Sequence, residues 1–228
     1  MRPYERNPAA IYAQSFATVR AEARLDRFDP AMQAVAIRLI HACGMVDVAD
    51  RLAFSPRAAE IGRAALRDGA PVICDCEMVA AGVIGRSLPA GNEVLVTLND
   101  PRVAGLAGTL RTTRSAAATE LWRDRLAGAV VAIGNAPTAL FHLLEMIEAG
   151  GPVPALILGF PVGFVGAAES KAELAARPRG AEFIALRGRR GGSAMAAAAV
   201  NALAAGLPGE GVAALAVAAD DSGDGGGS

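Results

Sequence analysis

The chain has 228 residues, of which 53% are hydrophobic and 4% aromatic, and its formal net charge is −1. A chain of this length buries roughly 70–75% of its unfolded surface, so it needs no disulfide bonds to be stable. The balanced charge excludes a general attraction to nucleic acid or to an anionic membrane, and an anionic ligand must therefore be held by local donors.

The cysteines and the apolar stretches restrict the class of protein further. The three cysteines, Cys43, Cys74 and Cys76, are odd in number and have no paired spacing, which argues against a secreted disulfide framework. No second cysteine pair or nearby histidine completes a metal site, so we expect no metal. The longest apolar stretch, residues 155–168, falls short of the ~20 residues that a membrane-spanning helix needs. We therefore expect a cytoplasmic protein without a membrane segment.

The first third of the chain is predicted to be helical. Apolar residues recur at helical spacing between Ala9 and Leu25, which indicates one apolar stripe. Asp29-Pro30 and Ser55-Pro56 each place a capping residue before a proline, the usual start of a helix. We expect the second helix to end at Gly44 and the third at about Asp68-Gly69.

After residue 70 the pattern changes to short apolar runs that alternate with helices. Strands are predicted at residues 71–74, 93–98, 129–133, 155–158 and 182–186. Helices are predicted at residues 77–80, 101–110, 114–126, 136–149, 168–176 and 193–205.

Continuous apolar runs are typical of strands buried on both faces of a parallel sheet. The sequence therefore predicts a three-layer α/β/α sandwich, Rossmann-like, with a mainly parallel five-stranded sheet. Residues 1–207 are expected to form a single domain. Residues 208–228, which end in Gly, Asp and Ser only, are expected to form a flexible tail.

Three predicted loops between a strand and a helix are rich in glycine. They are Gly134 to Thr138, Pro161 to Gly166, and Gly191 to Ser193. N–H groups at a helix start bind anions, although any one of these loops is equally compatible with a tight turn. Because all three converge on one edge of the sheet, we favour an anion-binding rim. None matches a Walker or dinucleotide motif, so a nucleotide-dependent enzyme is disfavoured and no such cofactor is expected.

His41 and Arg38 are predicted to lie near the end of the second helix. Residues three apart share a helix face, so an imidazole and a guanidinium are expected side by side. Histidine titrates near neutral pH, which makes such a pair suited to moving a proton beside an anion. Spacing alone favours the alternative, a packed histidine near a helix end with an arginine neighbour.

Eight blocks of sequence, spread over most of the chain, carry a common resemblance. They are Ser15-Phe16, His41 to Gly44, Phe54 to Pro56, Leu88 to Val94, Thr113 to Ala118, Val131 to Leu140, Gly159 to Lys171, and Gly188 to Met195. Together they resemble the precorrin-8X methylmutase family, from about Ile11 to Leu203.

The resemblance implies an isomerase of cobalamin biosynthesis. Such an enzyme moves a methyl group from C-11 to C-12 of precorrin-8X to give hydrogenobyrinic acid. It works without a cofactor, as a homodimer with its sites near the subunit interface. The histidine proposed as proton donor in the family corresponds to His41. Two alternatives stay open: a cobalt-precorrin-8 methylmutase of the anaerobic route, and a non-catalytic corrinoid-binding carrier.

The implied substrate is a corrinoid tetrapyrrole with many carboxylates, which arginines and helix-start N–H groups suit as donors. Substrate contacts are predicted at Ser15, Arg38, Gly91, Asn92, Arg114, Gly134 and Asn135. Each has a structural alternative: a surface arginine or serine, a turn, or a helix start. The remaining histidine, His142, and the single tryptophan, Trp122, are predicted to be structural.

Overall fold

The computed structural model describes residues 2–209, and within them one six-stranded sheet has the order β1-β6-β5-β4-β2-β3. The strands are β1 (Leu52–Phe54), β2 (Val72–Cys74), β3 (Val94–Val96), β4 (Val130–Ile133), β5 (Leu156–Gly159) and β6 (Glu182–Leu186). Five strands pair in parallel, and β1 pairs antiparallel with β6 at one edge.

Helices connect the strands and cover both faces of the sheet. Those before β4 are α1 (Pro8–Glu22), α2 (Pro30–Cys43), α3 (Val48–Arg51), α4 (Ala58–Arg67), α5 (Glu77–Gly82), η1 (Gly85–Ser87), α6 (Arg102–Leu110), α7 (Arg114–Thr119), η2 (Glu120–Trp122) and α8 (Arg123–Leu126). Those after β4 are α9 (Pro137–Glu148), α10 (Ala167–Ala176) and α11 (Ser193–Ala205).

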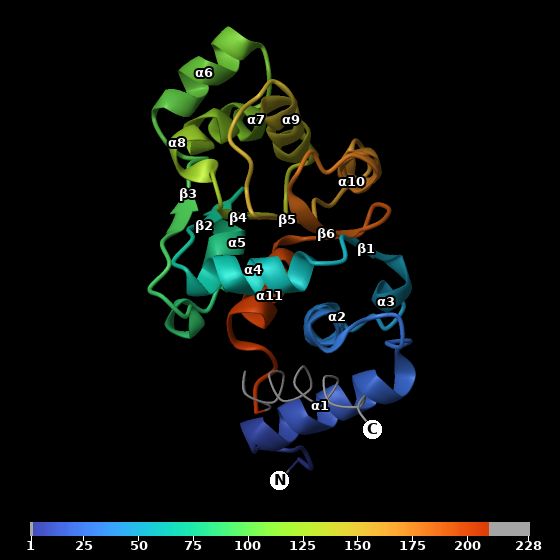
Figure 1. Cartoon of the computed structure of the whole chain (residues 1–228). Helices are drawn as coiled ribbons and strands as arrows, with labels where there is room; N and C mark the ends of the chain where they lie inside the picture. Colours follow the sequence, from blue (N-terminus) through green and yellow to red (C-terminus); the bar gives the residue numbers. More distant parts are fainter. Residues whose placement is uncertain (1, 210–228) are drawn as a thin grey trace, which may run out of the picture.

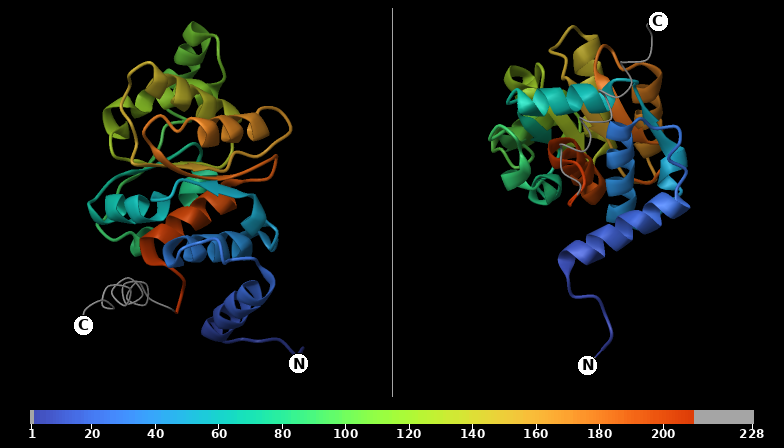
Figure 2. Two further views of the ribbon diagram at one scale, coloured as in Figure 1. Left: turned by 45° about the vertical axis from the view of Figure 1, so that its right-hand side comes forward. Right: turned by 60° about the horizontal axis from the view of Figure 1, so that its bottom comes forward.

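The sheet separates two helical layers, as Figure 1 and the left view of Figure 2 show. One layer contains α2, α4, α5 and α11, and α1 lies outside α2 as the outermost helix on that side. The other layer contains α7, α8, α9 and α10, and α6 projects beyond it. No helix among residues 2–209 is long and apolar enough to cross a membrane.

Alternation along the strands explains why both faces are covered. Successive side chains of a strand point to opposite faces. Val130 and Ala132 of β4 join the core cluster on the α2 and α11 side, whereas Val131 and Ile133 join the cluster against α9. All four are fully buried, so each face of the sheet needs its own helical cover.

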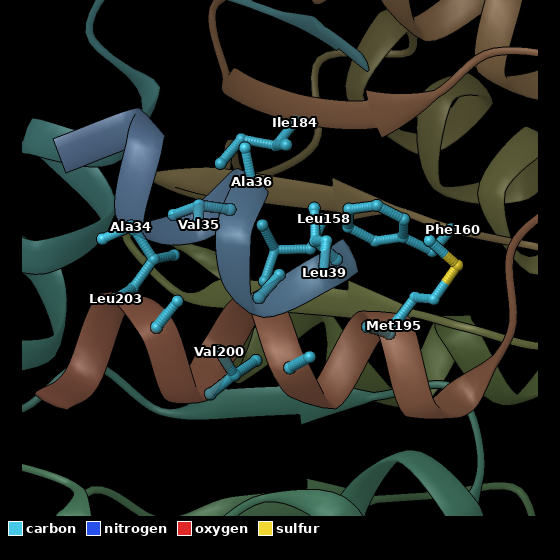
Figure 3. Close-up of a cluster of buried hydrophobic side chains, with 14 of the residues drawn as sticks. Ala34, Val35, Ala36, Leu39, Leu158, Phe160, Ile184, Met195, Val200 and Leu203 are labelled. Atoms are coloured by element: carbon cyan, nitrogen blue, oxygen red, sulfur yellow. The ribbon is translucent and has the colours of Figure 1, made fainter. Parts of the chain in front are cut away.

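Helix α11 forms the centre of the larger core. Figure 3 shows Leu203 of α11 near Ala34 of α2 at one end, and Met195 near Leu39 and Phe160 at the other. The two helices therefore run in opposite directions. The end of α2 lies beside the start of α11, at the carboxyl end of β5.

All five predicted strands are confirmed, and the prediction of a mainly parallel sheet with helices on both faces is correct. The number of strands was wrong, because β1 was missed; it is a short edge strand that pairs antiparallel with β6, far along the chain. The helix predicted at 114–126 is divided into α7, η2 and α8, and α1 ends three residues earlier than expected, at Glu22. Of the predicted tail, residues 210–228 lie outside the described part of the chain.

Candidate active site

His41 is exposed near the end of a helix whose other residues are mostly buried. As predicted, Asp29 caps α2, and its carboxylate accepts from the Met32 N–H at 2.8 Å. Gly44 ends the helix in the left-handed region, with φ of 69°, and its N–H donates to the Ile40 carbonyl at 2.7 Å. The cap is favourable there because glycine has no Cβ to strain. The backbone carrying His41 is therefore fixed while its side chain faces outward.

Helix α1 supplies the side chains around the His41 ring. Ser15 Oγ lies 2.8 Å from His41 Nδ1. The rings of Tyr12 and Phe16 each lie 5.4 Å from the imidazole, measured between centroids, and Phe16 meets it edge-on. Ser15 and Phe16 lie three and four positions after Tyr12, so both are its neighbours on the surface of α1. Sequence reasoning singled out Ser15 but missed Tyr12, whose helical spacing resembled an ordinary core stripe.

A cleft of about 400 Å³ lies between the two helices. Ser15, Thr18 and Glu22 line it from α1, and His41 and Gly44 line it from the end of α2. It combines an imidazole, two hydroxyls, an amide and a carboxylate with apolar side chains. Such a cleft is suited to a proton transfer on a ligand with an apolar body.

Arg38 forms no hydrogen bond with His41 among residues 2–209. Its guanidinium is half-buried, and Nη1 donates to the Gly206 carbonyl at 3.0 Å, beyond the end of α11. Burial lowers the pKa of Arg38, and the nearby Tyr12 opposes this effect. The predicted pairing of the two side chains on one face is therefore not formed in this structure.

The end of α2 lies close to the loops at the carboxyl ends of the strands. Arg190, which follows β6, donates to Met45 Sδ at 3.3 Å and to Asp47 Oδ1 at 3.0 Å. Lys171 of α10 donates to the carbonyls of Pro161 at 2.9 Å and Arg190 at 2.6 Å, which joins two of the three glycine-rich loops.

Lys171 is the only lysine in the chain, and its side chain is fully buried. Burial lowers its pKa to about 8. The sequence analysis did not predict that Lys171 would join two loops, although a single lysine among many arginines was an available signal.

A buried carboxylate binds the N–H groups of the first glycine-rich loop, at Gly134 and Asn135. Asp75 accepts from the N–H groups of Gly134 and Asn135 at 2.9 Å each and of Ala136 at 2.8 Å. Burial raises the pKa of Asp75, and the three donors oppose this shift. In this structure all three N–H groups therefore already donate to Asp75. A substrate role for this loop stays a prediction and now depends on the exposed side chain of Asn135.

The other two glycine-rich loops also use backbone donors internally. The Gly192 N–H donates to the Phe160 carbonyl at 2.8 Å, and the Gly163 N–H donates to the Arg189 carbonyl at 3.1 Å. A Cβ at Gly191 would lie 2.2 Å from the Phe160 oxygen, so that glycine is required by close packing. The loops do meet at one edge, but these N–H groups bind the loops to each other.

Arg114 is exposed at the start of α7, where Nη2 donates to the Leu98 carbonyl at 3.2 Å. The Thr113 hydroxyl, which caps α7, donates to Thr138 at the start of α9 at 2.8 Å. Arg114 therefore lies toward the carboxyl end of the sheet, as His41 does, but in the opposite helical layer.

Gly91 and Asn92 lie at the other end of the sheet, before β3. Gly91 forms a turn with φ of 62°. Asn92 is buried, and its amide donates to the carbonyls of Leu66 at 2.7 Å and Ala70 at 2.8 Å. Its oxygen accepts from the Ala90 N–H at 3.2 Å. A substrate contact here stays a prediction, and the structure assigns Asn92 a role in holding the loops.

The prediction that Trp122 is structural is confirmed by its place in the core, and a structural role of His142 stays a prediction. Trp122 is 2% exposed, and its indole N–H donates to the Thr97 hydroxyl at 2.8 Å. His142 Nε2 lies 2.6 Å from Glu120 Oε1. Cys74 and Cys76 are buried, and burial raises the pKa of the Cys74 thiol to about 12.

Comparisons with known proteins agree on one family. A family model described as precorrin-8X methylmutase matches residues 10–205. The chain is 63% identical over 204 residues to the Precorrin-8X methylmutase of Pseudomonas aeruginosa, covering 90% of this chain and 98% of the relative. It is 59% identical over 201 residues to the Precorrin-8X methylmutase of a Sinorhizobium species, covering 88% and 96% of the two chains.

More distant relatives carry a related name. The chain is 36% identical over 203 residues to the Cobalt-precorrin-8 methylmutase of Priestia megaterium, with 89% of each chain covered. Among solved structures, a precorrin-8x methyl mutase from Thermus thermophilus matches with a TM-score of 0.76 and 36% identity. That match covers 93% of this chain and 98% of the other.

Proposed function

Because the chain belongs to the precorrin-8X methylmutase family of cobalamin-pathway isomerases, we propose that it converts metal-free precorrin-8X into hydrogenobyrinic acid. The methyl group on C-11 of the macrocycle moves to C-12, with His41 as the proton donor. The observation that carries this assignment is the exposed His41 imidazole, held by Ser15 in the cleft between α1 and α2.

The chemistry needs one group that both gives and accepts a proton near neutral pH, and histidine suits this task. Protonated His41 delivers its proton to the macrocycle. The C-11 to methyl bond then breaks as the C-12 to methyl bond forms, and the proton returns to His41. Substrate and product are isomers, so the reaction balances without an external oxidant or reductant, and no cofactor is proposed.

Sequence similarity favours the metal-free substrate over the cobalt form. Identity is 63% and 59% to two relatives named for precorrin-8X, but 36% to one named for cobalt-precorrin-8. We expect a chromophore shift with metal-free precorrin-8X and a much slower change with cobalt-precorrin-8. A faster reaction with the cobalt form would reverse this assignment.

The substrate carboxylates need donors around the cleft. Of the two predicted arginines, Arg114 has the exposed guanidinium, and it lies toward the carboxyl end of the sheet in the helical layer opposite to the cleft. It is proposed to bind a carboxylate at the part of the macrocycle that extends beyond the cleft. Arg38 donates one N–H to the Gly206 carbonyl, and because a guanidinium has five N–H donors, a carboxylate contact is compatible with this bond. Arg114→Gln is expected to raise KM with little change in kcat, since it removes ground-state and transition-state binding equally.

A homodimer is proposed as the active form, with the cleft near the subunit interface. A cleft of about 400 Å³ holds only part of a tetrapyrrole larger than common drug-sized ligands. Apolar side chains are exposed beside the cleft, at Ile11 (44%) and Tyr12 (38%), and on the loop after β5, at Phe164 (86%) and Val165 (89%). Analytical ultracentrifugation tests this proposal, and a monomer at assay concentrations would contradict it.

The location is proposed to be the cytoplasm, with no nucleic-acid or membrane partner. The balanced charge and the three free cysteines support this proposal.

The role of His41 is tested with His41→Ala. Loss of general acid–base catalysis is expected to lower kcat by about 10²- to 10⁴-fold. Tetrapyrrole binding, followed by absorbance, is expected to remain. His142→Gln is the matched control, because it changes the only other histidine and leaves the cleft intact. Unchanged conversion by His41→Ala would remove His41 from its role and favour a different acid. A wild-type protein that binds the tetrapyrrole without turnover would instead favour the carrier.

A further inference from the structure

The bond between Ser15 and His41 is the feature that the proposed reaction leaves unexplained. Ser15 Oγ to Nδ1, at 2.8 Å, is the one hydrogen bond of the imidazole within residues 2–209. Nε2 has no hydrogen-bond partner in that part of the chain. The two ring nitrogens therefore have different surroundings, and the partner of one nitrogen determines which nitrogen exchanges a proton.

The contacts around the ring restrict its orientation. Tyr12 and Phe16 flank the imidazole, and Ser15 lies between them on the same helix. Two charged groups lie close by, Glu22 across the cleft and Arg38 one turn earlier on α2, and neither forms a hydrogen bond with the ring. Among the described residues, the Ser15 hydroxyl is thus the only polar group that fixes the ring.

A hydroxyl both donates and accepts, so it fits either charge state of the ring. When the ring is cationic, Nδ1–H donates to Ser15 Oγ. If Nε2 then gives up its proton, Nδ1–H still donates to the same oxygen. A neutral hydroxyl adds no charge that would hold the ring permanently in the cationic form, as a buried carboxylate partner tends to do.

We propose that Ser15 is a positioning residue that keeps Nδ1 of His41 protonated, so that the catalytic proton leaves and returns at Nε2 alone. The inference rests on the proposed role of His41 as proton donor. An isomerisation releases no net proton, so the nitrogen that gave the proton must be free to take it back. With Nδ1–H held by Ser15, Nε2 alternates between N–H and lone pair. The hydroxyl proton of Ser15 stays free to donate to a substrate group, so the predicted substrate contact of Ser15 is compatible with this role.

The tautomer of His41 tests the hydrogen bond without any turnover. The chain has two histidines, so the protein labelled with ¹⁵N-histidine gives two imidazole patterns, and His142→Gln assigns them. At a pH where the ring is neutral, wild type and Ser15→Thr are expected to show mainly the Nδ1–H tautomer. Ser15→Ala is expected to change toward the Nε2–H tautomer that an unrestrained imidazole prefers. The Nε2–H tautomer in wild type, or the same tautomer in all three proteins, would overturn the proposal.

Turnover tests whether the bond matters to the reaction. Ser15→Ala is expected to lower kcat by about 10- to 100-fold because the ring is no longer aligned. KM is expected to change little, and Ser15→Thr is expected to restore most of the rate. Thr109→Ala is the control, since it removes an exposed helix hydroxyl on α6, where Thr109 donates to the Gly105 carbonyl.

The kinetic outcomes separate this role from the others. A raised KM with unchanged kcat in Ser15→Ala would make Ser15 a substrate contact only and would overturn the positioning role. Full activity of Ser15→Ala beside an inactive His41→Ala would also overturn it, while leaving the proposed function in place. Full activity of His41→Ala would overturn the proposed function itself.

Discussion

Helices α1 and α11 have similar lengths and opposite roles. α1 has 15 residues, of which Phe16 and Val19 are buried. α11 has 13 residues, of which nine are buried. α11 lies under the centre of the sheet, whereas α1 is the outermost helix on the same side (Figures 1 and 2).

Neighbouring glycines allow α11 to pack so closely. A Cβ at Gly82 would lie 2.6 Å from Ala197 Cβ, and one at Gly134 would lie 2.7 Å from Ser193 Cα. Among residues 2–205, no glycine packs so closely against α1. The inner face of α1 instead contacts His41. We therefore expect α11 to contribute mainly to stability and α1 mainly to the geometry of the proposed site. α1, which surrounds the His41 ring, is therefore expected to be among the helices least important for folding.

The largest loss of stability is expected from Asp75→Ala, beside the start of α11. The substitution leaves three N–H groups, of Gly134, Asn135 and Ala136, without their acceptor. Unsatisfied buried donors are expected to lower the free energy of unfolding by about 3–5 kcal/mol. Urea denaturation measures the change. A loss below that of an exposed α1 substitution would contradict the division between the two helices.

Leu203→Ala in α11 and Ile11→Ala in α1 form a matched pair. Leu203 is 3% exposed and Ile11 is 44% exposed. The cavity at Leu203 is expected to lower the free energy of unfolding by about 2–4 kcal/mol. The exposed change at Ile11 is expected to alter it by about 0.5 kcal/mol or less. Equal losses in the two variants, by thermal or urea denaturation, would show that α1 shares the core.

Lys171 gives the region at the start of α11 a pH dependence. Its pKa is lowered to about 8 from an ordinary 10.5, so the unfolded chain binds the proton more tightly than the folded chain. Stability is therefore expected to rise between pH 8 and 10.5 by on the order of 1–3 kcal/mol, relative to Lys171→Met. No other lysine titrates in the chain. If the free energies of unfolding of the two proteins changed in parallel with pH, Lys171 would not have the lowered pKa of a buried cation.

Tyr12→Ala in α1 is expected to change the rate more than the stability. Tyr12 is 38% exposed, so the free energy of unfolding is expected to fall by about 1 kcal/mol or less. The rate is expected to fall by about 10-fold, because one wall beside the His41 ring is lost. Tyr12→Phe keeps the ring and is expected to keep the rate. A large stability loss with an unchanged rate would reverse the roles of the two helices.

Much of the fold could be predicted because it depends on local chemistry. Asp29-Pro30 and Gly44 mark the two ends of α2, and both are confirmed. The five apolar runs became strands because continuous apolar segments bury both faces. β1 was missed because its pairing with β6 depends on a partner about 130 residues away, as in Leu52 with Leu186. A similar distance in sequence separates Ser55 from Glu182, to which its hydroxyl donates. The sequence placed Ser55 before a helix and Glu182 in a strand, but it did not predict that they meet.

The sequence by itself determined the capped end of α2, the exposure of His41 and the strand pattern. Through the eight blocks that resemble known sequences, it also determined the family. These depend on residue type and short spacing. Only the tertiary structure decided which groups meet: Ser15 with His41 across 26 positions, Asp75 with Gly134 across 59, and Lys171 with the loop after β6. The reason is physical, because hydrogen bonds and packing act over a few ångströms in space and leave no local periodicity in the chain.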